Sequence, residues 1–176
     1  VKSKAPVVTE RLSFTGRYCV LTVGKTGIGF SAKIRDASYK ARLRELLECD
    51  LAGTKDLGVI VRTNAVTVEE CAVREELAEL MRTWQRLSAE AGCRVCYSCL
   101  YRALPGYIAA IRDSFGGTLE EIITDVPEYH RELKAYLEMC QKEDAGRLTL
   151  YEDSLLPLGR LYSLETAFEK ALGKNV

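Results

Sequence analysis

The sequence predicts a soluble-type core with an α/β fold, and the alternation of its elements with short connections is what predicts the fold class. Short runs rich in β-branched residues alternate with longer segments in which apolar residues recur at helical spacing, and the connections are short. Of the 176 residues, 47% are apolar and 28% are charged, a balance that allows the buried core of one domain or of two small ones. No apolar run approaches the roughly 18 residues of a membrane-spanning helix, so we expect no membrane span.

The first elements follow in order from the amino-terminal region. Residues 17–23, "RYCVLTV", alternate as a strand does, and residues 30–34, "FSAKI", are predicted to form the next strand. The intervening "GKTGIG" (24–29) is predicted to be a loop. A helix is expected after Asp36, a residue type favoured at the N-cap, because leucines then recur on one face.

A strand and the clearest helix of the chain come next. Residues 57–63, "LGVIVRT", are typical of a buried strand. Thr67 and Glu70 match the T-x-x-E capping box that marks a helix start. Apolar residues then recur at alternating steps of four and three and predict one buried face: Val73, Leu77, Leu80, Trp84, Leu87 and Ala91.

The second half of the chain continues the alternation. Residues 93–103 are β-like, and Pro105 stands where a helix would begin. The remaining expected elements are a strand at 120–125, a helix from Pro127 to about Lys142, a strand at 147–152 and a helix capped by Ser163 that runs to Leu172.

Charge is unevenly distributed along a chain of zero net charge. Residues 1–44 contain ten lysines and arginines against two acids, a net charge of +8 that the remaining residues balance. Such a basic segment indicates either a polyanionic partner or an ordinary solvated face, and charge alone leaves both open.

The cysteines and the single histidine do not predict a metal site. Cys93, Cys96 and Cys99 have a spacing that suggests zinc or an iron–sulfur cluster, but in a strand residues three apart point to opposite faces. His130 lies in a predicted helix without a partner motif. The odd count of seven cysteines favours reduced thiols and a cytoplasmic protein.

No catalytic constellation is visible in the sequence. "GKTGIG" lacks the spacing of a phosphate-binding P-loop, and a hairpin or Ω-like connection with Lys25 at its tip is favoured. The adjacent acids at 75–76 and 120–121 are expected to be solvated surface charges. We therefore expect no active site in this chain.

Arg62 and Thr63 end the predicted strand at 57–63 and suggest a different kind of site. A guanidinium fork and a hydroxyl are groups that hold a phosphate. The alternative is a strand end that meets water.

Several blocks of the chain together resemble the ribonuclease E/G family. They are "FTGRYCVL", "FSAKI", "GVIVRTNA" before a long helix with Trp84, "IRDSFGGTLEEIITDVP" and "RLTLYEDSLLPLGRLYSLETAFEKAL". The resemblance extends from about Arg11 to the last helix. The family's catalytic half holds an OB-type RNA-binding barrel, a 5′-sensor, a ribonuclease-H-like region and a deoxyribonuclease-I-like nuclease module.

The resemblance implies that this chain is a piece of a longer protein, an expectation that the absence of an initial methionine also favours. Residues 1–14 would be the tail of the barrel, residues 15–106 the 5′-sensor of mixed strands and helices, and residues 107–176 a partial ribonuclease-H-like α/β subdomain. The family's magnesium-binding motifs, Asp-Ile-Asn and Ile-Asp-Phe, and its zinc-binding cysteine pair do not occur here. The resemblance therefore implies no catalytic residue, metal or cofactor in this chain, which should be inactive alone, with Mg²⁺ belonging to the absent nuclease module.

The resemblance also implies a binding site for the 5′-monophosphate of RNA, in which Arg62 and Thr63 hold the phosphate. Gly16 would allow close approach of the backbone, and Val20 would seat the first base. Further RNA contacts would come from the basic side chains of Arg17, Lys25 and Lys33. The place of one basic residue of the family falls at Ala32 or Lys33, so that either the charge is missing here or Lys33 supplies it.

The implied parent is a bacterial, cytoplasmic endoribonuclease of RNA processing and mRNA decay. Its implied partners are single-stranded RNA with a 5′-monophosphate and its own nuclease module, with a homo-oligomer of the full-length protein left open. The alternative is a structural scaffold that packs against the nuclease module and has no ligand pocket.

Overall fold

The computed structural model describes residues 8–54, 56–114, 119–153 and 155–173. These residues form two compact units, one within residues 1–116 and one within residues 117–176. Helices and strands are mixed in the chain, which confirms the predicted α/β fold class. None of the helices in the described ranges has the length and apolar character needed to cross a lipid bilayer.

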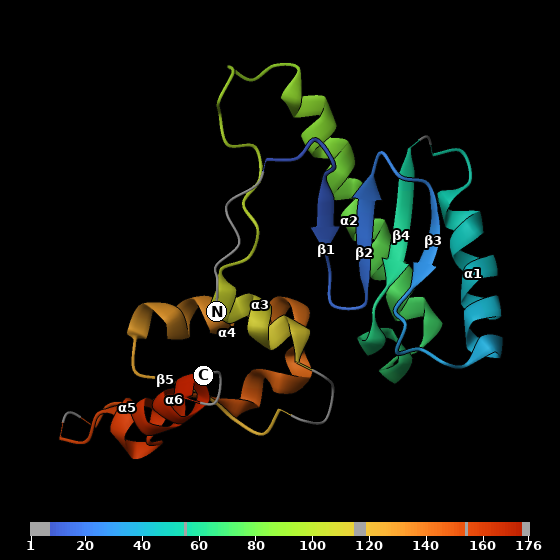
Figure 1. Cartoon of the computed structure of the whole chain (residues 1–176). Helices are drawn as coiled ribbons and strands as arrows, with labels where there is room; N and C mark the ends of the chain where they lie inside the picture. Colours follow the sequence, from blue (N-terminus) through green and yellow to red (C-terminus); the bar gives the residue numbers. More distant parts are fainter. Residues whose placement is uncertain (1–7, 55, 115–118, 154, 174–176) are drawn as a thin grey trace. The chain divides into compact units, whose positions relative to one another are not determined.

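A four-stranded sheet is the centre of the first unit. Its strands are β1 (Ser13–Thr15), β2 (Cys19–Val23), β3 (Gly27–Phe30) and β4 (Leu57–Val61), in the spatial order β1-β2-β4-β3 (Figure 1). β2 pairs antiparallel with β1 and with β4, whereas β3 pairs parallel with β4. Parallel neighbours need a long crossover, and helix α1 (Ala37–Leu51) supplies it.

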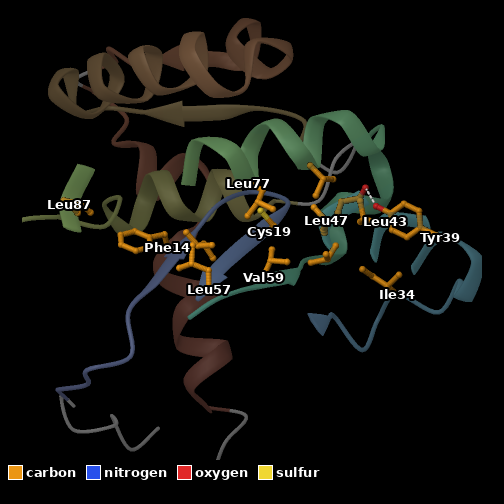
Figure 2. Close-up of a cluster of buried hydrophobic side chains, with 14 residues drawn as sticks. Phe14, Cys19, Ile34, Tyr39, Leu43, Leu47, Leu57, Val59, Leu77 and Leu87 are labelled. Carbon is orange, nitrogen blue, oxygen red and sulfur yellow. Dashed lines mark hydrogen bonds between the residues drawn. The ribbon is translucent and has the colours of Figure 1, made fainter. Parts of the chain in front are cut away.

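The core of the first unit lies between one face of the sheet and two helices, α1 and α2 (Glu70–Ala91). Side chains alternate along β2, so that Cys19 and Leu21 are buried whereas Val20 lies on the opposite face. Figure 2 shows the buried side chains that meet in this core. They include Phe14, Cys19, Leu43, Leu47, Leu57, Val59, Leu77 and Leu87.

The strand predicted at 30–34 is wrong, since β3 occupies Gly27–Phe30 and residues 31–34 form a turn. In this turn the amide of Ile34 donates to the carbonyl of Ser31 at 3.0 Å, and the Ile34 side chain enters the core. Part of the loop predicted at 24–29 is in fact strand β3, and Gly58 on β4 is what allows this pairing. A Cβ there would collide with the carbonyl oxygens of Lys25 and Gly27, so only glycine allows this approach of the two strands.

The helix start at Asp36 is confirmed, whereas the predicted capping box is wrong. Asp36 accepts hydrogen bonds from the amides of Ser38 and Tyr39, at 2.8 and 3.1 Å, at the N-terminus of α1. Thr67 instead ends a 3-10 helix, η1 (Thr63–Thr67), and its hydroxyl donates to the carbonyl of Asn64 at 2.8 Å.

The apolar stripe predicted for the long helix is confirmed over most of its length. Val73, Leu77 and Leu87 of α2 are buried, and Leu80 and Trp84 pack against the core. Ala91 is exposed, because it lies at the last residue of the helix, where the exposed segment 93–104 follows.

The β-like segment at 93–103 contains no strand. Its residues form turns and irregular structure, and every residue from 93 to 104 is exposed. A strand requires hydrogen-bonding neighbours, which this segment does not have among the described residues. Helix α3 (Gly106–Asp113) then begins directly after Pro105, as expected.

The second unit is a small α/β arrangement. Strands β5 (Ile122–Thr124) and β6 (Leu148–Leu150) pair in parallel, and helix α4 (Pro127–Cys140) connects them, with Leu133 and Leu137 buried. Both strands, the start at Pro127 and a helix after Ser163 agree with the sequence analysis. The unit also contains a 3-10 helix, η2 (Lys142–Arg147), and helices α5 (Leu158–Leu161) and α6 (Leu164–Gly173).

Candidate functional site

Arg62 and Thr63 lie together at the end of β4, where the sequence analysis placed a phosphate site. The amide of Arg62 donates to the carbonyl of Tyr18 at 2.7 Å, so the backbone extends the pairing of β2 and β4 by one residue. The Arg62 side chain is 24% exposed, which leaves part of the guanidinium accessible to a ligand. Thr63 is also partly exposed and begins η1.

The Arg62 guanidinium is tied down on one side. Its Nη1 donates to the carbonyl oxygen of Gly16 and to Oδ1 of Asp113, both at 2.7 Å. Nε and Nη2 have no hydrogen-bond partner among the described residues. Through these two nitrogens, on one edge of the guanidinium, an arginine can donate two parallel hydrogen bonds to a phosphate or a carboxylate.

Asp113 joins Arg62 to a second arginine. Arg112 donates from Nε to Oδ1 of Asp113 at 2.8 Å and from Nη1 to the carbonyl of Thr15 at 2.8 Å. The hydrogen bond from Arg62, with the help of Arg112, lowers the pKa of Asp113 to about 2. Two guanidinium groups and one carboxylate leave one net positive charge in this cluster.

The Thr63 hydroxyl has a neighbour that the sequence analysis did not single out. Its Oγ1 lies 3.1 Å from Oγ of Ser31, and the amide of Ser31 donates to the carbonyl of Val61 at 2.8 Å. Two hydroxyl groups therefore stand side by side next to the exposed turn that contains Ala32 and Lys33. The available signal was the hydroxyl of Ser31 in "FSAKI", directly before Ala32 and Lys33.

The β1–β2 loop wraps around an internal carboxylate. Glu76 of α2 accepts hydrogen bonds from the amides of Arg17, Tyr18 and Cys19, at 2.6, 2.7 and 2.8 Å. A Cβ on Gly16 would lie 2.5 Å from Oε2 and 2.7 Å from Oε1 of Glu76. The close approach that Gly16 allows in the structure is therefore that of Glu76.

The prediction that Glu76 is a solvated surface charge is wrong, since it is only partly exposed and bonded to the loop. The neighbouring Glu75 is exposed, as expected. The sequence signal was the place of Glu76 directly before the fully buried Leu77, beside the apolar stripe of α2. Burial, together with the smaller effect of the Glu76 carboxylate, raises the pKa of the Cys19 thiol far above its usual range, so Cys19 is a neutral core residue.

Val20 lies on the face of the sheet that turns away from the core. It pairs with Ile60 of β4, which is 40% exposed, and the two make an apolar spot two residues before Arg62. The structure thus places the four predicted site residues Gly16, Val20, Arg62 and Thr63 at adjoining ends of β2 and β4.

The three additional basic residues differ in their accessibility. Arg17 is only 9% exposed, and its guanidinium lies over the ring of Tyr18, 5.6 Å from the ring centroid. Lys25 and Lys33 are exposed, the first between β2 and β3 and the second in the turn after β3. Arg17 therefore offers much less of its charge to a ligand than the two lysines do.

The strand argument used against a metal site at the cysteines is wrong, because Cys93, Cys96 and Cys99 lie in an irregular, exposed segment. Within the part of the chain that the structure describes, no group of three or more His, Cys, Asp or Glu side chains could hold a metal ion.

Comparison with known proteins defines the class. The sequence model of the Ribonuclease E/G family matches residues 13–176, so the chain belongs to this family. It is 30% identical over 146 residues to Ribonuclease E of Synechocystis sp., an alignment that covers 83% of this chain and 21% of that protein. It is 27% identical over 176 residues to Ribonuclease E of Nostoc sp., covering 99% of this chain and 25% of the relative.

A third relative, Ribonuclease G of Haemophilus influenzae, is 29% identical over 178 residues, covering 99% of this chain and 35% of that protein. The chain thus spans between about a fifth and a third of the length of these relatives.

Proposed function

We propose that this chain is the RNA-binding part of a bacterial, single-strand-specific endoribonuclease, and that Arg62 and Thr63 recognise the 5′-monophosphate of the RNA. The observation that carries the proposal is the geometry of Arg62. Its Nη1 is held by Gly16 and Asp113, while Nε and Nη2 have no partner among the described residues and the side chain is partly exposed. A terminal phosphate can accept two parallel hydrogen bonds from that edge.

The neighbouring groups support the same ligand. The hydroxyl of Thr63 can donate to a phosphate oxygen, and Ser31 stands 3.1 Å from it. The exposed Lys33 adds positive charge from the turn beside these hydroxyls. Val20 and the exposed Ile60 offer an apolar surface for the first base. A 5′-hydroxyl end has no charge for Arg62 to bind, so a phosphorylated end is favoured.

RNA cleavage is assigned to a nuclease module outside this chain, with Mg²⁺ as its cofactor. The chain spans 35% or less of the three relatives compared above, which leaves room in the parent protein for such a module. In this proposal residues 15–106 form the 5′-sensor and residues 107–176 a partial ribonuclease-H-like subdomain. The parent acts in the cytoplasm, where its RNA substrates are.

Fluorescence anisotropy with two short RNAs that differ only in a 5′-monophosphate or a 5′-hydroxyl tests the proposal. Charged hydrogen bonds contribute about 1.5–3 kcal/mol each, so Arg62→Ala is expected to weaken binding of the phosphorylated RNA by roughly 10-fold to 100-fold. Binding of the hydroxyl RNA should change little. Arg82→Ala is the matched control, because Arg82 is exposed on α2 and pairs with Glu79, three residues before it.

A second candidate function is a scaffold without a ligand. The observation that favours it is the ion pair of Arg62 with Asp113, since this contact also joins α3 to the end of β4. A scaffold predicts equal affinity of the wild-type chain for both RNA ends and loss of thermal stability in Arg62→Ala. Equal affinity for the two ends would therefore reject the 5′-sensor.

A further inference from the structure

We propose that Asp113 is a positioning residue of the phosphate site, which holds the Arg62 guanidinium so that its Nε–Nη2 edge faces the ligand. This inference rests on the proposed function, because it assigns a role within the same site. Asp113 belongs to α3, 51 residues after Arg62 in the sequence.

The hydrogen bonds of Arg62 determine its orientation. The Nη1 group carries two hydrogens, and one is donated to Gly16 and the other to Asp113, both at 2.7 Å. Because a guanidinium is planar, two bonds to Nη1 fix both the plane and the direction of the opposite edge. A phosphate that binds Nε and Nη2 then meets a donor pair that is already aligned.

Asp113 is itself held in place by the neighbouring residue. Arg112 donates from Nε to the same Oδ1 of Asp113, and its Nη1 is anchored on the carbonyl of Thr15. The Arg112 side chain is only 12% exposed, whereas that of Asp113 is 40% exposed. The contacts thus run from β1 through Arg112 and Asp113 to Arg62, and each is charged or made to a backbone carbonyl.

Preorganisation is the physical benefit of this arrangement. A free arginine side chain loses rotamer freedom when it binds, and a side chain that is already held loses less. The carboxylate does not neutralise the site, because Arg62 and Arg112 together leave one net positive charge. Since the two arginines lower the pKa of Asp113 to about 2, the carboxylate is ionised between pH 5 and 8.

A competing role for Asp113 makes the opposite prediction. If the carboxylate blocked Arg62 by competing with the phosphate, its removal would strengthen binding of phosphorylated RNA. The deciding quantity is the end preference, which is the ratio of the Kd for 5′-hydroxyl RNA to the Kd for 5′-monophosphate RNA. This ratio is independent of contacts that both RNAs share, and a purely structural role of Asp113 would leave it unchanged.

The experiment measures the end preference of the 176-residue chain by anisotropy for wild type, Asp113→Ala and Asp113→Asn. We expect Asp113→Ala to lower the preference roughly 5-fold to 10-fold. Asp113→Asn should keep most of it, because the amide oxygen can accept the same hydrogen bonds. Glu48→Ala, which removes an exposed acid of α1, is the control and should leave the preference unchanged. If the alanine variant does not fold, Asp113→Ser, whose hydroxyl lies one bond closer to the backbone than the carboxylate oxygens do, replaces it.

The outcomes separate this inference from the proposed function. Suppose that the end preference of the wild type disappears in Arg62→Ala. An unchanged or increased end preference in Asp113→Ala would then overturn the positioning role alone. A wild type without end preference, or a preference that survives Arg62→Ala, would overturn the 5′-sensor itself and the role of Asp113 with it.

Discussion

Alanine substitutions of Glu76 and Gly16, singly and together, are expected to show that the Glu76 carboxylate organises the β1–β2 loop. Glu76→Ala removes the acceptor for three consecutive backbone amides, at Arg17, Tyr18 and Cys19. Hydrogen bonds to charged groups contribute about 1.5–3 kcal/mol each. Because Glu76 is only half-buried, water can bond to some of the amides once the carboxylate is removed, so the three contributions do not add in full. The expected loss of unfolding free energy is therefore about 2–4 kcal/mol. Glu75→Ala, an exposed neighbour on α2, is the control and should stay within about 0.5 kcal/mol of wild type.

Gly16→Ala is expected to destabilise the same loop by steric means. The added Cβ would lie 2.5 Å from Oε2 of Glu76, and the carboxylate cannot move away without breaking its three backbone hydrogen bonds. Overpacking of this kind costs about 1–3 kcal/mol. Once Glu76→Ala has removed the obstacle, Gly16→Ala should cost less than about 1 kcal/mol. The double-mutant cycle should therefore show a coupling equal to the difference between these two costs, up to about 3 kcal/mol and above the roughly 0.5 kcal/mol within which independent sites add.

Trp84 makes this measurement specific to the first unit. It is the only tryptophan of the chain, and its ring packs against Phe14 of β1 with a centroid separation of 6.1 Å. Urea unfolding followed by Trp84 fluorescence thus reports the unit that contains the loop. Additive effects of the two substitutions, to within about 0.3–0.5 kcal/mol, would refute the argument that Glu76 is what excludes a side chain at residue 16.

Two further predictions concern pH and catalysis. The pKa of Asp113, lowered to about 2, means that its ion pair with Arg62 stabilises the fold above the ordinary pKa of 3.8 and is lost as pH falls from there through about 2. The end preference should therefore not follow Asp113 between pH 5 and 8. It should rise with the second ionisation of the phosphate near pH 6, as anisotropy at a series of pH values would show, and a flat profile would contradict a requirement for the dianion. The purified chain with Mg²⁺ should leave RNA intact on a denaturing gel, and cleavage that a chelator abolishes would contradict the assignment of catalysis to another module.

Local structure could be predicted where it depends on spacing along the chain. The apolar stripe of α2 and the N-cap at Asp36 are read from residues within one or two turns of each other, and both are present. The strand at 30–34 was misplaced by a few residues because its position depends on Gly58, a partner far along the chain. The β-like segment at 93–103 has strand propensity without a neighbouring strand to pair with, and propensity alone does not form a sheet.

In the candidate site, too, residue types could be predicted from the sequence, whereas contacts with distant residues could not. Arg62 and Thr63 could be selected from the sequence, because a guanidinium and a hydroxyl at the end of a buried strand have a recognisable chemistry. Their surroundings could not be predicted. The sequence places Glu76 beside the apolar stripe of α2, but it does not show the partner of this carboxylate, the β1–β2 loop 57 to 59 residues away.

The sequence by itself determined which side chains could hold a phosphate and which helix faces are apolar, since both follow from residue type and from periodicity. Only the tertiary structure decided how those side chains are oriented. Gly16 and Asp113, 46 and 51 residues from Arg62, reach the same nitrogen of its guanidinium because the strand order and the packing of α3 bring them together. A hydrogen bond acts over about 3 Å, so its partners are defined by position in space and not by separation along the chain.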